Sequence, residues 1–193
     1  GTVDDQFDPI TELEKRLGKP LPERETLRAA VEARSLHQLI AQGLQPGVIE
    51  TLQQATKLGL KIGLASSSNR DWVESHLQRL KIMHYFHCIR TFSDVGSAKP
   101  DPELYLSVLD YFTVLPQEAI ALEDSPNGIQ AARTAGIFCI AIPNSLTRHL
   151  DLSQANLRLQ SLTELNLHQL QHQFNGQNQK PDESTHQNMA REK

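Results

Sequence analysis

The chain has 193 residues, of which 38% are hydrophobic, and its formal net charge is −4. This length suffices for one domain with a small appendage, whereas the negative charge provides no basic surface for nucleic acid. No apolar run in the sequence approaches the length of a membrane span. The two cysteines, Cys88 and Cys139, lie in apolar strand-like runs, which is typical of buried thiols in a reducing compartment. We therefore expect a cytoplasmic protein whose partners include neither nucleic acid nor a membrane.

Residues 8–43 show helical patterns only. The first helix is expected to begin at Pro9, after a capping aspartate, and to end at Gly18. A second helix is expected to begin after Pro22 and to end at Gly43. The two elements predict a helical hairpin.

After residue 46, short apolar runs that predict strands alternate with amphipathic runs that predict helices. The predicted strands are residues 60–65, 88–91, 119–122, 138–142 and 157–159, and a last helix is predicted at residues 163–173. This alternation is typical of a doubly wound α/β fold, in which helices cover both faces of one parallel sheet. Residues 174–193 contain no Ile, Leu, Val, Trp or Tyr, so we expect a disordered tail there.

One stretch combines a buried strand with a helix start. The apolar run that ends at Leu122 is followed by Glu123 and Asp124, and then by Ser125 and Pro126, which favour the first turn of a helix. Ligands of open parallel sheets bind where strands end and helices begin. Two adjacent carboxylates repel each other unless a cation lies beside them, and oxygen ligands suit Mg²⁺. The stretch therefore indicates a magnesium site, with a plain helix cap as the alternative.

Two further segments offer groups that bind phosphate. Ser66 directly follows a predicted strand, and its hydroxyl, with the backbone N–H groups from Ser67 onward, can hold an anionic oxygen. Lys99 lies in a loop stiffened by prolines, where its charge can neutralise a phosphate and pair with Glu123 or Asp124. Taken separately, the serines are also typical of a helix cap and the lysine of a solvated loop. Together with the acidic pair they predict a phosphate-handling site, because phosphoryl transfer depends on charge neutralisation and positioning.

These motifs resemble those of the haloacid dehalogenase (HAD) superfamily, and most closely its β-phosphoglucomutase-like phosphatase branch. The resemblance is carried by Ser66 after a strand, by Lys99 within residues 98–102, and by residues 122–132. It implies that Ser66 and Ser67 bind the transferring phosphoryl group and that Lys99 balances its charge. It also implies that Asp124 binds Mg²⁺ directly, and that Glu123 supports the metal through water or as a further ligand.

The resemblance also implies how the chain is divided. Residues 1–45 are expected to form a partial α-helical cap, residues 46–173 a HAD-like Rossmannoid α/β core, and residues 174–193 the tail. The family's nucleophile is the first aspartate of an Asp-x-Asp-Gly motif at the end of the central strand, and the sequence contains no such motif. We expect the chain to begin inside the cap; a start directly after the motif is the alternative.

A missing central strand has a structural and a functional consequence. In the family's sheet this strand lies between the strands that end at Ser66 and Glu123, so two strand edges are expected to remain unpaired. Such edges favour self-association or a partner that supplies a strand. The intact protein is expected to be a Mg²⁺-dependent phosphatase that acts on a small phosphorylated metabolite through an aspartyl-phosphate, and this chain alone to be close to inactive. The alternatives are a β-phosphoglucomutase-type mutase and a non-catalytic fragment that binds phosphate or a partner.

Overall fold

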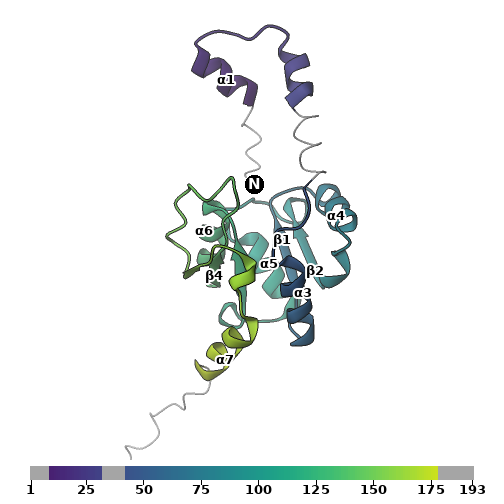
Figure 1. Cartoon of the computed structure of the whole chain (residues 1–193), viewed down its shortest axis with the longest axis vertical. Coiled ribbons are helices and arrows are strands. Elements are labelled where there is room, and N and C mark those ends of the chain that lie inside the picture. Colours follow the sequence, from purple (N-terminus) through teal and green to yellow (C-terminus); the bar gives the residue numbers. More distant parts are fainter. Residues whose placement is uncertain (1–8, 32–41, 178–193) are drawn as a thin grey trace, which may run out of the picture.

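The structure is a computed structural model that describes residues 9–31 and 42–177 (Figure 1). Its helices are α1 (Pro9–Leu17), α3 (Val48–Lys57), α4 (Arg70–Arg79), α5 (Glu103–Phe112), α6 (Pro126–Thr134) and α7 (Leu167–Gln177), and residues 24–31 are also helical. Its strands are β1 (Gly63–Ser66), β2 (Cys88–Thr91), β3 (Ile120–Glu123), β4 (Phe138–Ala141) and β5 (Leu157–Arg158). Short 3-10 helices lie at Met83–Tyr85, Phe92–Asp94, Pro116–Glu118 and Leu162–Glu164. The predicted alternation of strands and helices is therefore confirmed.

The strands form two parallel sheets. β1 pairs with β2, and β4 lies between β3 and β5. The parallel α/β class is confirmed, and no strand among residues 9–31 and 42–177 joins β1 to β3. Instead, the side chain of Lys99 connects them: its Nζ donates to Ala65 O of β1 at 2.9 Å and to the Glu123 carboxylate of β3. The division falls where the sequence analysis places the missing strand.

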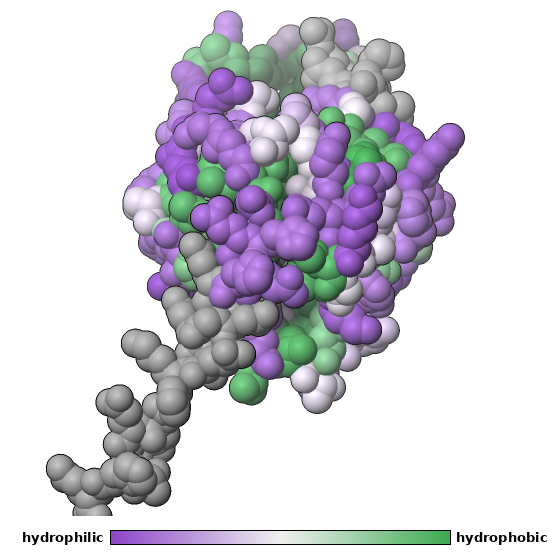
Figure 2. All heavy atoms as spheres, turned by 60° about the horizontal axis from the view of Figure 1, so that its bottom comes forward, coloured by the Kyte–Doolittle hydropathy of each residue, from purple (hydrophilic) through white to green (hydrophobic). Residues whose placement is uncertain are grey.

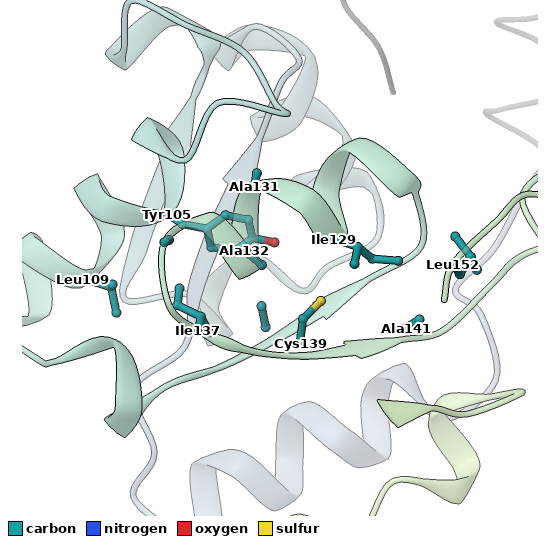
Figure 3. Close-up of a cluster of buried hydrophobic side chains, with 11 residues drawn as sticks. Tyr105, Leu109, Ile129, Ala131, Ala132, Ile137, Cys139, Ala141 and Leu152 are labelled. Carbon is teal, nitrogen blue, oxygen red and sulfur yellow. The ribbon is translucent and has the colours of Figure 1, made fainter. Parts of the chain in front are cut away.

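Helices cover both faces of the three-stranded sheet. Alternate residues of β4 point to opposite faces and pack against different helices. Cys139 packs in one cluster with Tyr105 of α5 and with residues of α6 (Figure 3). Ile140, the next residue, packs in another cluster with Ala55 of α3 and Leu167 of α7. Burial also raises the pKa of the Cys139 thiol to about 12. Cys88 and Cys139 are both free and buried, so the prediction of buried thiols is confirmed.

The strand β1 begins later than predicted. Leu60 is not in the strand, because its backbone N–H donates to Ala55 O at 3.0 Å and closes the end of α3. The strand instead runs from Gly63 through Ser66. Ser66 is therefore the last strand residue, and its side chain has a fixed place at the sheet's edge.

The loop before α3 requires a glycine. Gly47 has φ +86°, and a Cβ at this position would lie 2.6 Å from Thr163 N and 2.7 Å from Leu162 C. Only a residue without a side chain allows the backbone to approach this closely. The close approach holds the start of α3 against the 3-10 turn that precedes α7.

The first two helical segments are connected by polar contacts around Glu14. Its carboxylate accepts Arg24 Nη1 at 2.6 Å and Leu21 N at 3.0 Å, and Gly18 ends α1 with φ +66°. Figure 1 shows α1 apart from the α/β core. The hairpin prediction is thus consistent with residues 9–31, whereas residues 32–41 of the second predicted helix lie outside the described residues.

The C-terminal helix has the predicted length but lies four residues later in the chain. α7 runs from Leu167 to Gln177, so the predicted tail boundary at Phe174 is wrong by four residues. The reason is an aromatic contact: the rings of Phe174 and Phe138 meet edge to face, with centroids 5.4 Å apart, a favoured geometry for buried aromatic pairs. The remainder of the predicted tail, residues 178–193, lies outside the described residues.

Figure 2 shows a face that is mostly hydrophilic, with hydrophobic residues in small separate patches. Among the residues that the structure describes, no helix combines the length and apolar character that a membrane crossing requires.

A partly exposed ion pair connects the end of β2 to the start of α4. Asp94 accepts hydrogen bonds from Thr91 N and Oγ1, both at 2.8 Å, and pairs with Arg70 at 2.7 Å. Burial by itself would raise the pKa of the Asp94 carboxyl, but the hydrogen bonds from Arg70 and Thr91 outweigh it and lower this pKa to about 2. A carboxyl whose pKa is lower in the folded than in the unfolded state stabilises the fold above the unfolded pKa.

The Asp94 carboxylate is therefore expected to contribute about 1 kcal/mol to the free energy of unfolding at neutral pH, less than the full pKa shift implies, because solvent screens the exposed ion pair. This contribution is lost as the pH falls from about 4 toward the folded pKa of about 2. Urea denaturation of Asp94→Asn between pH 2 and pH 7 tests this expectation. The variant should lose stability at pH 7 and show a flatter pH dependence, whereas Asp71→Asn, an exposed carboxylate of α4, should behave like the wild type.

Candidate active site

A cavity of about 880 Å³ lies at the ends of β1 and β3. All five residues that the sequence analysis selected line it, namely Ser66, Ser67, Lys99, Glu123 and Asp124. The reason is topological: β1 and β3 are both parallel strands of an α/β fold, and the ends of such strands lie at the same edge.

Lys99 is held at the centre of these groups. Its Nζ donates to the Glu123 carboxylate and to Ala65 O, and it lies 4.8 Å from the centroid of the Tyr105 ring. The side chain is only 12% exposed. A lysine that is desolvated, ion-paired and placed over an aromatic face is a positioned charge, not a solvated loop residue.

Glu123 is the more buried of the two adjacent carboxylates, with 7% of its side chain exposed. Its Oε1 accepts hydrogen bonds from Lys99 Nζ and from the Tyr105 hydroxyl. Its other oxygen lies against Gly128, where a Cβ would overlap the carboxylate. Burial and the adjacent Glu123 charge raise the pKa of the Tyr105 hydroxyl well above its usual value. Tyr105 therefore stays protonated and donates to the carboxylate.

Asp124 occupies a different environment, although it is the next residue. It is half-buried and faces the cavity, and its Oδ2 accepts a hydrogen bond of 2.6 Å from Asn144 Nδ2. The chain leaves the strand at this point and enters α6, which Ser125 caps by accepting from Gly128 N at 3.2 Å. The cap and Pro126 at the first helical position confirm the local prediction, and the two adjacent carboxylates have different hydrogen-bond partners.

The two serines have distinct contacts. Ser66 Oγ accepts a hydrogen bond from Ser68 N at 3.1 Å, whereas Ser67 Oγ accepts one from Lys99 N at 3.2 Å. Ser67 is 5% exposed. The Ser67 hydroxyl therefore fixes the backbone of the lysine loop, and Ser66 is the serine at the strand end beside the cavity.

The acidic pair offers Mg²⁺ only part of a ligand set. In residues 9–31 and 42–177 no three His, Cys, Asp or Glu residues gather into a metal centre. Mg²⁺, however, usually keeps several waters and takes one or two carboxylates together with substrate phosphates. Glu123 and Asp124 fit the protein's share of such a site, and Asp124 is the carboxylate that Lys99 does not already neutralise.

Three site residues were not selected from the sequence. Tyr105 lies among the apolar residues of α5. A buried phenol needs a hydrogen-bond partner, and that requirement is the signal that could have identified it. Gly128 follows the acidic pair closely in the sequence, but only the fold shows that its lack of a side chain leaves room for the Glu123 carboxylate. Asn144 lies in the loop after β4, and the sequence carries no signal that connects it to Asp124.

A parallel α/β fold with an ion-paired lysine, a serine and two carboxylates around a cavity at the strand ends is the arrangement of a phosphate-handling enzyme. The family model for haloacid dehalogenase-like hydrolases matches residues 5–142. The chain belongs to this family, and the resemblance seen in the sequence is confirmed.

Individual relatives support the same assignment. YhcW of Bacillus subtilis (strain 168) is 40% identical over 172 residues, which cover 89% of this chain and 78% of the relative. The β-phosphoglucomutase of the same organism is 35% identical over 107 residues, 55% of this chain and 46% of that enzyme. Several other curated relatives are named as phosphatases.

A solved structure shares the fold. A mutant of CbbY from Rhodobacter sphaeroides, in complex with xylulose-(1,5)-bisphosphate, aligns with a TM-score of 0.64 at 30% identity. The alignment covers 77% of this chain and 68% of that one. The α/β HAD fold is therefore confirmed together with the family.

Proposed function

We propose that this chain carries the phosphate- and Mg²⁺-binding part of a phosphatase that acts on a small phosphorylated metabolite such as a sugar phosphate. The observation that carries the proposal is the convergence of Ser66, Lys99, Glu123 and Asp124 on one cavity. The bisphosphate sugar in the complex of the related CbbY supports the substrate class.

Each residue has a role that follows from its contacts. Ser66 and the backbone N–H groups that follow it donate to phosphoryl oxygens. Lys99, held by Glu123 and Ala65 O, stabilises the charge that develops on the transferring group without having to reorganise. Asp124 would hold Mg²⁺, which, when bound, neutralises phosphate charge. Glu123 keeps Lys99 in place and would support the metal ligand Asp124 as its neighbour in the chain.

The proposal assigns the attacking carboxylate to a strand outside this sequence, because the family's Asp-x-Asp-Gly motif has no counterpart in it. No strand of residues 9–31 and 42–177 pairs with the second edge of β1 or of β3, so a partner or a second copy that adds a strand there would complete the sheet. This chain alone is then a binding module, and its hydrolysis of p-nitrophenyl phosphate with Mg²⁺ should remain near background. Robust turnover that Asp124→Ala abolishes would contradict the missing nucleophile but support the phosphatase site.

In the completed enzyme, the reaction product distinguishes a phosphatase from a mutase. Release of phosphate would identify a phosphatase, and formation of an isomeric sugar phosphate would identify a mutase.

Ligand binding by the chain alone provides the direct test of the site. Mg²⁺ with glucose 6-phosphate or inorganic phosphate is expected to raise the melting temperature, since at 100 times the dissociation constant a ligand stabilises the fold by about 2.7 kcal/mol. Asp124→Ala should lose the Mg²⁺-dependent part of this shift. Asp110→Ala, an exposed carboxylate of α5, should retain it. A wild-type chain whose melting temperature neither ligand changes would contradict the proposed site.

A further inference from the structure

The loop after β4 contributes one side chain to the acidic pair. Because β4 pairs with β3 in parallel, from Ile120↔Phe138 to Glu123↔Ala141, the chain beyond β4 emerges at the same edge as Asp124. Asn144 lies in this loop and lines the cavity. Its Nδ2 donates to Asp124 Oδ2 at 2.6 Å, the short distance typical of a hydrogen bond to a carboxylate.

The orientation of the Asn144 amide is determined by its own loop. Asn144 Oδ1 accepts hydrogen bonds from Leu146 N at 2.7 Å and from Thr147 N at 3.1 Å, and Asn144 N donates to Thr147 Oγ1 at 3.1 Å. Only the amide oxygen can accept from these two N–H groups. The amide nitrogen must therefore face Asp124, and the reverse orientation of the amide is excluded.

This contact makes the two oxygens of the Asp124 carboxylate different. Oδ2 is engaged by Asn144, whereas no hydrogen bond to Oδ1 is found from any residue of the described ranges. A carboxylate free to rotate would present either oxygen, but one held at Oδ2 presents the other.

From this we infer that Asn144 is a positioning residue that fixes the rotation of the Asp124 carboxylate, so that Oδ1 is the oxygen offered to a divalent cation. The inference rests on the proposed Mg²⁺ role of Asp124. The loop after β4 would then take part in cation binding, although it lies outside the sequence motifs that predict the site. Outer partners of this kind orient metal ligands, and their loss typically weakens metal affinity about 10- to 100-fold.

The test is a titration of the chain with Mn²⁺, a paramagnetic substitute for Mg²⁺, followed by water-proton relaxation. Asn144→Ala is expected to weaken Mn²⁺ binding about 10- to 100-fold, in the direction of the loss produced by Asp124→Ala. Thr147→Val is the matched control, because it removes the acceptor for Asn144 N but leaves the amide opposite Asp124. This control should retain affinity within about threefold, and circular dichroism should show that all variants are folded.

The outcomes separate the inference from the proposed function. Wild-type affinity in Asn144→Ala, or equal losses in Asn144→Ala and Thr147→Val, would overturn the positioning role alone. No Mn²⁺ binding by the wild type would overturn both the inference and the Mg²⁺ role of Asp124.

A second measurement does not depend on metal. The Asn144 side-chain amide should show slow proton exchange by nuclear magnetic resonance, and Asp124→Ala should remove this protection. Rapid exchange in the wild type would contradict the contact itself.

Discussion

Replacement of Lys99 by methionine is expected to lower the free energy of unfolding by about 3 to 5 kcal/mol, the usual cost of leaving one partner of a buried ion pair uncompensated. Glu123 and Lys99 have side chains only 7% and 12% exposed, so water cannot replace the lost ammonium. The substitution also leaves Ala65 O without its donor. Methionine keeps the volume and length of the side chain, which confines the effect to charge and hydrogen bonding.

Urea denaturation of the single and double variants measures this effect. In Lys99→Met/Glu123→Gln the carboxylate is replaced by an amide that can still accept from Tyr105, so the double variant should recover part of the lost stability. Lys57→Met, at the exposed end of α3, serves as the matched control and should change stability little. Equal stability of Lys99→Met and Lys57→Met would show that the pair at the cavity is not coupled to the fold.

Replacement of Gly128 by alanine is expected to destabilise the protein by about 3 kcal/mol, because the new methyl group occupies the space of the Glu123 carboxylate. Gly128 lies inside α6 and has no left-handed backbone angle. Alanine would ordinarily stabilise such a helical position by about 0.5 to 1 kcal/mol relative to glycine. A loss of stability here therefore reports the displacement of Glu123 and not a backbone effect.

Gly96→Ala is the matched control for this substitution. A Cβ at Gly96 would lie 3.6 Å from Glu103 Oε2, an ordinary contact with a carboxylate, and should cost little. Thermal denaturation of both variants checks the expectation, and the melting temperature shift produced by Mg²⁺ with phosphate should also decrease in Gly128→Ala. If Gly128→Ala is as stable as Gly96→Ala, the carboxylate of Glu123 can move away at no cost and is not fixed by its surroundings.

Local patterns were sufficient for most of the fold. The apolar runs around Cys88 and Cys139 predict β2 and β4 because a strand of a parallel sheet is buried on both faces. Ser125 and Pro126 predict the start of α6 because capping depends on neighbouring residues only. The end of α7 was predicted wrongly because Phe174 packs on Phe138, a residue distant in the sequence, and no local pattern contains that contact.

The class of fold and the five side chains that line the cavity could be predicted from the sequence alone, because in a parallel α/β fold the residues that end the strands lie at a common edge. It left open whether Lys99 pairs with Glu123 or with Asp124. The tertiary structure decided that Glu123 takes the lysine, since Tyr105 and Gly128 surround it there, and that Asp124 is held by Asn144. Lys99, Tyr105 and Asn144 lie 24, 18 and 20 residues from the carboxylates that they contact. Their hydrogen bonds exist only once β3, β4 and α5 have packed together.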